Sequence, residues 1–356
     1  MNLSGPVKIV GCGLIGTSIA LRLKENGVKL ILADTNERNL NLATDLVGIE
    51  EVDANPGLVL LAIPPNQVFD SARAEFAINP SAVFIDVMGI KSKLINKVEG
   101  FPELARNYVS VHPMAGRETS GPESARSDLF VSRAWIISKS ESSTSDALSV
   151  ARNLGELMGS TIYELDAEAH DSAIASISHM PQIVSSALGA TLNDVDVESL
   201  NLAGQGLRDV SRLAESDPEL WSGLLIGNAE QILPKISEVI NRLSTLSKAL
   251  ETNDEPSVKT FLQQGRDGRN RIPGKHGQAK RDYTYLPIVI DDKPGGLARI
   301  FNECAELDVN IEDLSIEHSP GQAVGLVTLA LSSVDAFRLQ KHLVAKGWLA
   351  HTPRKS

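Results

Sequence analysis

A glycine-rich segment near the N-terminus has the residue types and spacing that hold a pyrophosphate. Its G-x-G-x-x-G pattern follows an apolar strand-like run at residues 7–10 and opens a helix-like segment at residues 17–26. In such a turn the first glycine permits a tight bend, the second lets the backbone approach the phosphates, and the third lets helix and strand pack closely. N–H groups at the helix start complete the site. The predicted phosphate-binding residues are Gly11, Gly13, Leu14, Ile15 and Gly16.

Asp34 is the residue that should choose between the two nicotinamide dinucleotides. It ends a second strand-like run at residues 29–33, about eighteen residues past Gly16. A carboxylate there accepts hydrogen bonds from the ribose hydroxyls and repels a 2′-phosphate. The pattern therefore predicts NAD rather than NADP. The alternative is a glycine turn followed by a solvated aspartate.

Two histidines are candidates for proton transfer. His112 follows the strand-like run 108–111, and ligands of open α/β folds bind at the carboxyl ends of such strands. Because imidazole titrates near neutral pH, His112 is a candidate general base. The alternative is a capping or core histidine. His179, in the sequence Ser178-His179-Met180-Pro181, is the second candidate, or else a polar residue at a helix kink before Pro181.

Arg208 and Arg212 are candidates for binding a carboxylate. If the segment is helical, their four-residue spacing places both on one face. Guanidinium groups bind carboxylates through paired hydrogen bonds. The alternative is a surface face on which they pair with Glu215 or Asp217.

The elements that must position these residues fall into four segments. Residues 1–163 alternate strand-like and helix-like runs, which predicts an α/β domain with a parallel sheet covered on both faces, a Rossmann dinucleotide-binding domain. Residues 164–264 show helical periodicity and predict an all-helical domain. Residues 265–282 are basic, with Gly and Pro interspersed, which is typical of a linker. Residues 283–356 give β-α-β-β-α-β, a ferredoxin-like unit.

The composition excludes several other classes of protein. With 356 residues, 42% hydrophobic and 22% charged, the chain is long enough for two or three domains. No apolar run reaches membrane-spanning length, and the N-terminus does not have the pattern of a signal peptide. The net charge of −11 argues against nucleic-acid binding. Two cysteines, Cys12 and Cys304, indicate neither a disulfide framework nor a zinc site, so we expect no metal and a cytoplasmic protein.

Taken together, these motifs resemble the prephenate/arogenate dehydrogenases of tyrosine biosynthesis over essentially the whole chain. The C-terminal unit resembles an ACT domain, an amino-acid-sensing module. The further segments that carry the resemblance are Leu61-Ala62-Ile63-Pro64-Pro65, Asp86-Val87-Met88-Gly89-Ile90-Lys91, His112–Gly116 with Glu118 and Ser120-Gly121, Ser178–Pro181, and Gly206–Arg212 with Ser216-Asp217-Pro218 and Trp221.

The resemblance implies oxidative decarboxylation of prephenate to 4-hydroxyphenylpyruvate with NAD, or alternatively conversion of arogenate to tyrosine. It implies that His112 accepts the C4 hydroxyl proton and that His179 lies near nicotinamide and substrate. Arg212 would anchor the ring carboxylate with support from Arg208, and Glu118 would pair with an arginine and gate the pocket. The remaining implied contacts are Ser178 and Gln182 for the substrate and Ile63 and Pro64 for the cofactor.

The sequence departs from the family pattern at two positions. Gly89 stands where the family usually has a serine that hydrogen-bonds the catalytic histidine; Ser92 or a water is a possible substitute. Gln182 stands where many prephenate-using members have a histidine. This position bears on the choice between prephenate and arogenate, with prephenate as the family default.

The resemblance also implies partners. The family is dimeric through its helical domain, so we expect a homodimer. ACT domains bind an amino acid between a β–α turn and a neighbouring strand, so tyrosine is the first expected effector and phenylalanine the next. The alternative is an ACT unit kept only for dimer contacts. The predicted effector-binding residues are Asp292, Pro294, Gly295, Gly296, Asn310 and Ile311.

Particular residues argue against other functions. A β-hydroxyacid dehydrogenase or an imine reductase generally has a catalytic lysine on the long helix, where this chain has Ser178-His179. A catalytically inactive sensor would not need the intact glycines, histidines and arginines. A nucleic-acid patch in the basic segment 265–282 would need interleaved aromatic residues, which that segment lacks.

Overall fold

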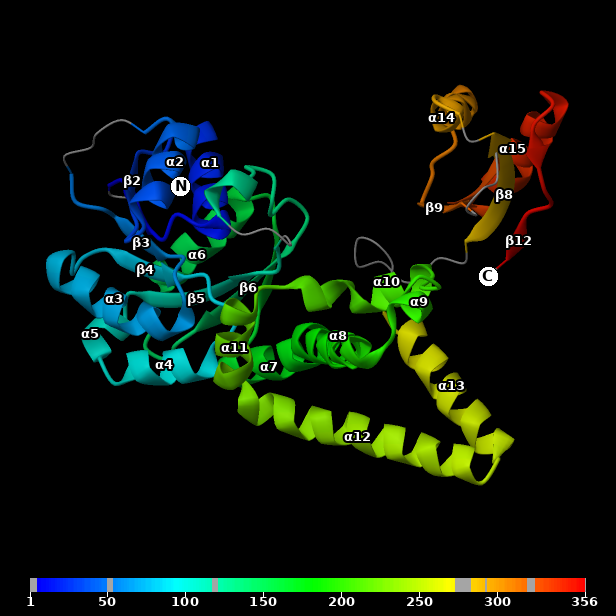
Figure 1. Ribbon diagram of the computed structural model, residues 1–356. Coiled ribbons are helices and arrows are strands. Elements are labelled where there is room, and N and C mark those ends of the chain that lie inside the picture. The colour runs from blue at the N-terminus through cyan, green and yellow to red at the C-terminus, as the bar shows by residue number, and fades with distance from the viewer. Residues whose placement is uncertain are drawn as a thin grey trace. The chain divides into compact units, whose positions relative to one another are not determined.

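The computed structural model describes residues 5–49, 54–116, 121–272, 283–291, 293–318 and 324–355. They form two compact units, Met1–Val258 and Lys259–Ser356 (Figure 1). Within the described ranges, no helix is both long and apolar enough to cross a membrane.

The first unit is built on a seven-stranded sheet. Its order is β2-β1-β3-β4-β5-β6-β7, with β1 to β5 parallel, β6 antiparallel to β5, and β7 parallel to β6. Because β2 and β3 lie on opposite sides of β1, the carboxyl end of β1 is a switch point, where α/β folds bind ligands. The strands are β1 Val7–Val10, β2 Leu30–Ala33, β3 Leu58–Leu61, β4 Val83–Asp86, β5 Tyr108–Pro113, β6 Ala134–Lys139 and β7 Thr161–Glu164.

Alternating side chains of the strands enter two separate cores. In β3, Leu58 and Leu60 pack into one core with α1, α2 and α6, whereas Val59 and Leu61 pack into the other with α3, α4 and α5 (Figure 1). A strand buried on both faces reads as a continuous apolar run, which explains why these strands were recognisable. The helices are α1 Leu14–Glu25, α2 Glu37–Val47, α3 Pro65–Ile78, α4 Ser92–Glu99, α5 Pro102–Ala105 and α6 Ser145–Leu157.

A helical region follows the sheet, as the periodicity predicts, and its helices are interrupted. The helical segment over residues 167–191 contains a π-helical turn, and the segment over 218–251 breaks at Asn228. The elements are α7 Ala167–Ile174, the π turn η2 Ala175–His179, α8 Met180–Thr191, η3 Leu192–Asp194, α9 Val197–Leu200, α10 Gln205–Ser211, the 3₁₀ turn η4 Arg212–Glu215, α11 Pro218–Gly227, α12 Ala229–Glu251 and α13 Glu255–Asn270.

The predicted linker is wrong over its first six residues, because α13 continues to Asn270. Gly265 and Gly268 each cost a helix about 1 kcal/mol relative to alanine, but arginine is a good helix former. In addition, the Gln263 side chain donates to Asp267 one turn on, at 2.7 Å. These contributions favour helix where the glycines indicated a loop. Residues 273–282 of the predicted linker lie outside the described residues.

The strands and helices after residue 283 have the predicted β-α-β-β-α-β order. The sheet order is β11-β8-β10-β9, all antiparallel, with β12 also paired to β8. Side chains of α14 and α15, such as Ile300 and Leu339, share one core with Leu286 and Leu329 of the sheet. The elements are β8 Thr284–Asp291, α14 Gly296–Glu306, β9 Asp313–His318, β10 Val324–Leu331, α15 Ser333–Ala345, β11 Leu349–Ala350 and β12 Arg354–Lys355.

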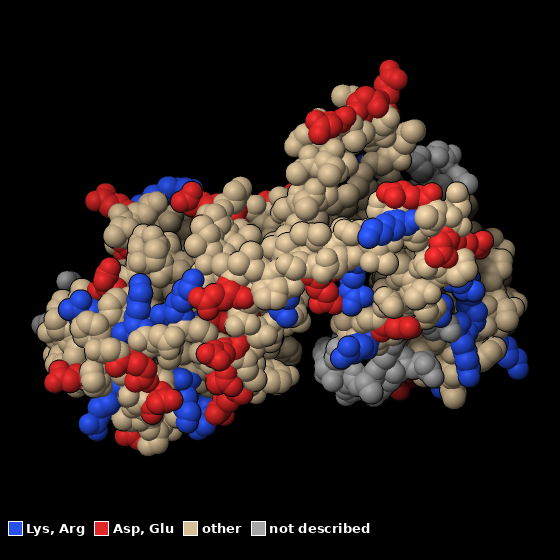
Figure 2. Space-filling view, turned by 90° about the horizontal axis from the view of Figure 1, so that it is seen from below, with Lys and Arg blue, Asp and Glu red and all other residues tan. Residues whose placement is uncertain are grey.

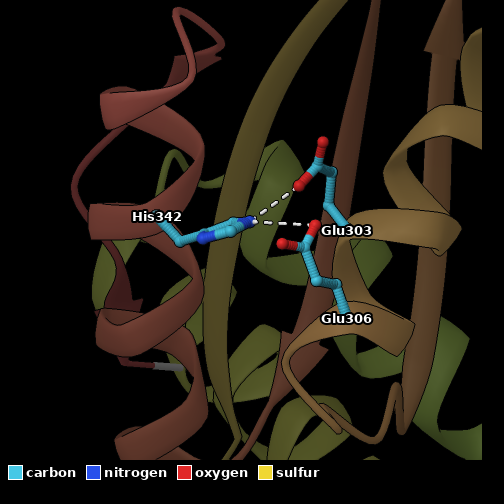
Figure 3. Close-up of side chains that lie close together, drawn as sticks. All are labelled: Glu303, Glu306 and His342. Carbon is cyan, nitrogen blue, oxygen red and sulfur yellow. Dashed lines mark hydrogen bonds and ion pairs between the residues drawn. The ribbon is translucent and has the colours of Figure 1, made fainter.

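An ion-pair cluster links α14 to α15 (Figure 3). Nε2 of His342 lies 2.7 Å from a carboxylate oxygen of Glu303 and 4.0 Å from one of Glu306. These three residues are close enough to share a cation. Nζ of Lys346, however, already lies 2.7 Å from Glu303 and 2.5 Å from Glu306. We therefore interpret the cluster as a set of ion pairs that holds the two helices together, rather than as a metal site.

Candidate active site

The glycine turn has the shape that a dinucleotide phosphate requires. Gly11 has φ +101°, and a side chain there would collide with the main-chain oxygen of Ala62. At Gly13, by contrast, a Cβ would meet no atom of the described residues within 4 Å. Gly13 is the N-cap of α1, and no side chain in the described ranges caps it. The first N–H groups of α1 and the open face of Gly13 therefore fit a pyrophosphate.

The other predicted cofactor residues surround this turn. Leu14 and Ile15 open α1, Ile63 follows β3, and Pro64 precedes α3. A Cβ built on Gly11 would lie 2.8 Å from Cγ2 of Ile63, so the end of β3 packs against the turn. The arrangement lies at the switch point of the sheet, where the fold favours a ligand.

Asp34 is fixed beside the same turn. One carboxylate oxygen accepts from the N–H of Cys12 at 2.6 Å and the other from the N–H of Asn36 at 2.8 Å. Each oxygen keeps a lone pair for a ribose hydroxyl. Burial, together with the charge of Asp34, raises the pKa of the Cys12 thiol to about 12, so this cysteine stays neutral. These residues fit NAD.

His112 lies at the carboxyl end of β5 and begins a chain of polar contacts. Its Nδ1 lies 3.0 Å from Nε2 of His170, and Nδ1 of His170 lies 2.8 Å from a carboxylate oxygen of Asp171. His170 and Asp171 belong to α7 and are buried. On the other side of the ring, a Cβ built on Gly89 would lie 3.6 Å from Nε2 of His112. The segment after β4, the end of β5 and α7 therefore meet at His112.

The surroundings keep these imidazoles neutral. Burial lowers the pKa of His112 well below its ordinary 6.5, and the charge of Lys91 and the neighbouring histidines lower it further. Burial also lowers the pKa of His170, against the opposing effect of Asp171. For Asp171, hydrogen bonds from His170 and from main-chain N–H groups outweigh burial and lower its pKa. At neutral pH this series of contacting side chains therefore consists of two neutral imidazoles, those of His112 and His170, and the carboxylate of Asp171.

His179 is held by a second set of contacts from the same region. Its Nδ1 lies 3.2 Å from Nδ2 of Asn228, which also donates to the main-chain oxygen of Asp171 at 2.8 Å. Its ring packs edge to face on Trp221 at a centroid distance of 6.0 Å. Burial lowers the pKa of His179 to about 4. His179 ends the π turn η2, and such turns are frequent at functional sites.

A buried lysine fixes the segment that faces His112. Nζ of Lys91 donates to the main-chain oxygens of Val111 at 2.6 Å and Met88 at 2.7 Å, and lies 3.2 Å from a carboxylate oxygen of Asp86. The hydroxyl of Tyr108 donates to the other oxygen of Asp86 at 2.8 Å. The ammonium therefore ties the segment that carries Gly89 to the strand that carries His112.

The two arginines lie on the surface, whereas His170 and His179 are buried. Arg208 is in the last turn of α10, and Arg212 opens η4; both are exposed in this chain. The helix tightens from α to 3₁₀ geometry between them, so the spacing of one regular α-helix does not extend through Arg212. Glu118 lies outside the described residues.

Gln182 supports the turn that carries Arg212. Its Nε2 donates to the main-chain oxygen of Leu213 at 2.8 Å and to Ser186 at 3.2 Å, and its Oε1 accepts from Ser216 at 3.2 Å. The side chain is buried, and Ser178, four residues earlier, is half-buried. Gln182 therefore connects α8 to η4.

Sequence reasoning missed His170, Asp171, Asn228 and Lys91. The first two had a detectable signal, because adjacent His and Asp precede Ser178 by only a few residues on a helix-like segment. Asn228 gave none, because its role depends on how α12 packs against η2. Lys91 ends the segment 86–91 that carries the family resemblance, but no role of its own is predicted for it.

The predicted effector site coincides in part with a cavity of about 290 Å³ in the C-terminal unit. Of the predicted effector-binding residues, Gly295 and Gly296 line this cavity, and Asp292 lies outside the described residues. Pro294, Asn310 and Ile311 are not among its lining residues. The neighbouring strand β9 begins only at Asp313, so Ile316 faces the cavity instead. The full lining is Ile290, Asp291, Lys293, Gly295, Gly296, Leu297, Ala298 and Ile316.

Comparison with known proteins agrees with this geometry. The family described as "Prephenate dehydrogenase, nucleotide-binding domain" matches residues 19–164, and "Prephenate dehydrogenase, dimerization domain" matches residues 166–264. The protein named "Probable prephenate dehydrogenase NovF" from Streptomyces niveus is 30% identical over 97% of this chain and 99% of its own length. The prephenate dehydrogenase of Bacillus subtilis is 26% identical over 94% of each chain.

A solved structure gives the same result in three dimensions. Prephenate dehydrogenase from Aquifex aeolicus, in complex with hydroxyphenyl propionate and NAD⁺, covers 76% of this chain and 99% of its own, with 26% identity and a TM-score of 0.68. Together, the sheet, the glycine turn and the relatives define an NAD-dependent dehydrogenase with a nucleotide-binding domain and a helical region. The chain belongs to the prephenate dehydrogenase family.

Proposed function

We propose that the protein oxidatively decarboxylates prephenate to 4-hydroxyphenylpyruvate. The observation that carries the proposal is His112, a half-buried neutral imidazole at the carboxyl end of β5, in a chain of the prephenate dehydrogenase family. When bound, NAD⁺ supplies the acceptor for the hydride that leaves C4 of the substrate.

The residues of the chain account for the proton and the carboxylate. His112 accepts the C4 hydroxyl proton as C4 becomes a carbonyl carbon. The bond to the ring carboxylate then breaks, CO2 leaves, and the electron pair makes the ring aromatic. The resulting phenolate takes the proton back from His112. Arg212, supported by Arg208, holds the ring carboxylate until the bond breaks, and His179 contacts substrate and nicotinamide.

The test is NADH formation at 340 nm with prephenate, arogenate and a panel of 2- and 3-hydroxy acids. Prephenate should give the highest kcat/KM. A higher value with arogenate would favour the alternative substrate, and activity only with hydroxy acids would overturn the assignment.

We propose that the protein is a homodimer formed through its helical region. That region exposes large apolar side chains on α8, α11 and α12, and exposed apolar surface of this kind marks protein–protein contacts when it is contiguous. Figure 2 shows interspersed charges with broad uncharged areas between them. Mass measurement in solution is the test: a monomer at micromolar concentration would contradict the proposal. The exposed side chains include Val184, Leu220, Ile226, Leu233, Ile240, Leu243 and Leu250.

We propose that the C-terminal unit is an ACT domain that binds an aromatic amino acid, tyrosine first and phenylalanine next. The support is its β-α-β-β-α-β order, its cavity, and the N-terminus of α14 at the edge of that cavity, because the start of a helix suits a carboxylate. Inhibition by tyrosine should disappear when residues 283–356 are deleted. An intact enzyme insensitive to tyrosine, or an equally inhibited truncated one, would contradict the proposal.

A further inference from the structure

Asp171 must be an ionised acceptor. One carboxylate oxygen accepts from the N–H of Lys91 at 2.9 Å and lies 2.8 Å from Nδ1 of His170. The other accepts from the N–H of Ser92 at 2.8 Å. Main-chain N–H groups can only donate, so three donors converge on the carboxylate. Nδ1 of His170 therefore carries a hydrogen.

That hydrogen determines the tautomer of the next ring. His170 is fully buried and neutral, so with Nδ1 protonated its Nε2 holds a lone pair. The atom 3.0 Å away is Nδ1 of His112, which must then donate. Because His112 is also neutral, its own Nε2 is left unprotonated and able to accept.

The surroundings of Nε2 of His112 agree with Nδ1 as the donor and Nε2 as the acceptor of this ring. Nε2 faces Gly89, where even a Cβ would lie 3.6 Å away, and that Cβ would lie 3.3 Å from Cδ2 of Leu224. Neither residue offers a polar side-chain atom. The titratable groups whose charges act on His112 are Lys91, His170 and His179. The described contacts therefore orient His112 from its Nδ1 side.

The second histidine takes the opposite tautomer. The side-chain nitrogen of Asn228 faces the main-chain oxygen of Asp171 at 2.8 Å, and only the amide NH2 can donate there. Its other hydrogen is available to Nδ1 of His179 at 3.2 Å. Nδ1 of neutral His179 is then the acceptor, and its Nε2 carries the hydrogen.

We propose that His170 and Asn228 are positioning residues that, both anchored on Asp171, set opposite tautomers on the two active-site histidines. His112 presents an acceptor at Nε2 and removes the hydroxyl proton. His179 presents a donor at Nε2 and binds an oxygen of the substrate or of the nicotinamide amide. This inference rests on the proposed function for the roles, but the tautomers themselves can be measured without substrate.

Two substitutions at residue 170 separate positioning from packing. An asparagine amide can reach the place of Nδ1 and keep the bond to Asp171, but it cannot reach His112. A glutamine amide can place Oε1 where Nε2 was and still accept from His112. His170→Asn should lower kcat by roughly 10- to 100-fold, the usual cost of losing an orienting partner, with little change in KM. His170→Gln should keep most of the activity.

The tautomers are read directly by ¹⁵N NMR of histidine-labelled protein without substrate. In the wild type, Nε2 of His112 should give an unprotonated signal and Nε2 of His179 a protonated one, with His112→Asn and His179→Asn assigning them. His170→Asn should abolish the single His112 tautomer, whereas His170→Gln should preserve it. A protonated Nε2 on wild-type His112 overturns the proposal. Equal kcat losses in both folded variants, with unchanged His112 signals, also overturn it, because only packing would then be involved.

Discussion

Gly89 lies directly against the reactive nitrogen of His112: a Cβ at residue 89 would be 3.6 Å from Nε2. A serine at this position would bring its hydroxyl into reach of that nitrogen. The resemblance places a serine here in the family, whereas this chain has a glycine and orients His112 through His170 at 3.0 Å. A serine at residue 89 would contact the imidazole at Nε2, whereas His170 contacts it at Nδ1.

Restoring the serine should therefore compensate for loss of His170. Gly89→Ser alone should change kcat little, because His112 is already oriented. In His170→Asn, however, it should recover a large part of the lost kcat, which a double-mutant cycle in kcat detects as non-additivity. Gly89→Ala is the control, since it adds the Cβ, with its 3.3 Å contact to Leu224, but no hydroxyl. Equal recovery by alanine and serine would exclude hydrogen bonding as the cause.

His112 and Arg212 should fail in different ways. His112→Asn removes the proton acceptor needed in the transition state, so kcat should fall by roughly 10²–10⁴-fold. Arg212→Ala removes carboxylate binding, so KM for prephenate should rise most. Initial rates over a range of prephenate concentrations separate the two effects. An unchanged kcat in His112→Asn would require another base.

Cofactor choice should depend on the charge of Asp34. Asp34→Asn keeps the shape and an amide oxygen that can accept from Cys12, but it removes the charge that repels a 2′-phosphate. The ratio of kcat/KM for NAD⁺ over NADP⁺ should fall by roughly tenfold or more, about 1.4 kcal/mol. Asp34→Ala should narrow the ratio and also weaken NAD⁺ use, because both main-chain contacts are lost. Equal use of the two dinucleotides by the wild type would contradict the role of Asp34.

Much of this site follows from local sequence, and part of it does not. The glycine turn, Asp34 and His112 lie at strand ends that apolar runs reveal, so their positions could be predicted. His170 reaches His112 across 58 residues, and Asn228 reaches His179 across 49. The first contact needs α7 to pack beside the end of β5, and the second depends on the π turn η2 and on the packing of α12 against it. No local pattern encodes such packing, just as the glycines of α13 did not reveal a helix.

Acid should destabilise the protein through histidines whose pKa falls on folding. The pKa of His179 falls from 6.5 to about 4 on folding, and those of His112 and His170 also fall. Between pH 6.5 and 4 the unfolded chain therefore binds more protons than the folded one, so the stability present above pH 6.5 declines as the pH falls. The urea midpoint should be lower at pH 5 than at pH 7.5. His179→Gln should reduce that difference, whereas His351→Gln, at an exposed position, should not.

Gln182 should affect both substrates through the turn that carries Arg212. The family resemblance implies that Gln182 contacts the substrate and bears on the choice between prephenate and arogenate. In the structure both amide hydrogens are engaged, one by the main-chain oxygen of Leu213, which is adjacent to Arg212. We therefore expect that Gln182→Ala frees η4 and raises KM for prephenate and arogenate by similar factors, roughly 3- to 10-fold for the loss of one or two hydrogen bonds.

The matched control for this prediction is Ser186→Ala, which removes one partner of the amide and leaves the contact with Leu213 intact. Its KM values should stay near those of the wild type. Gln182→His then distinguishes the two roles, because an imidazole cannot reproduce all three contacts of the amide. If Gln182 holds the turn, KM for both substrates rises and the ratio of kcat/KM is kept. If that ratio shifts toward prephenate, residue 182 contacts the substrate side chain directly, and the positioning role is wrong.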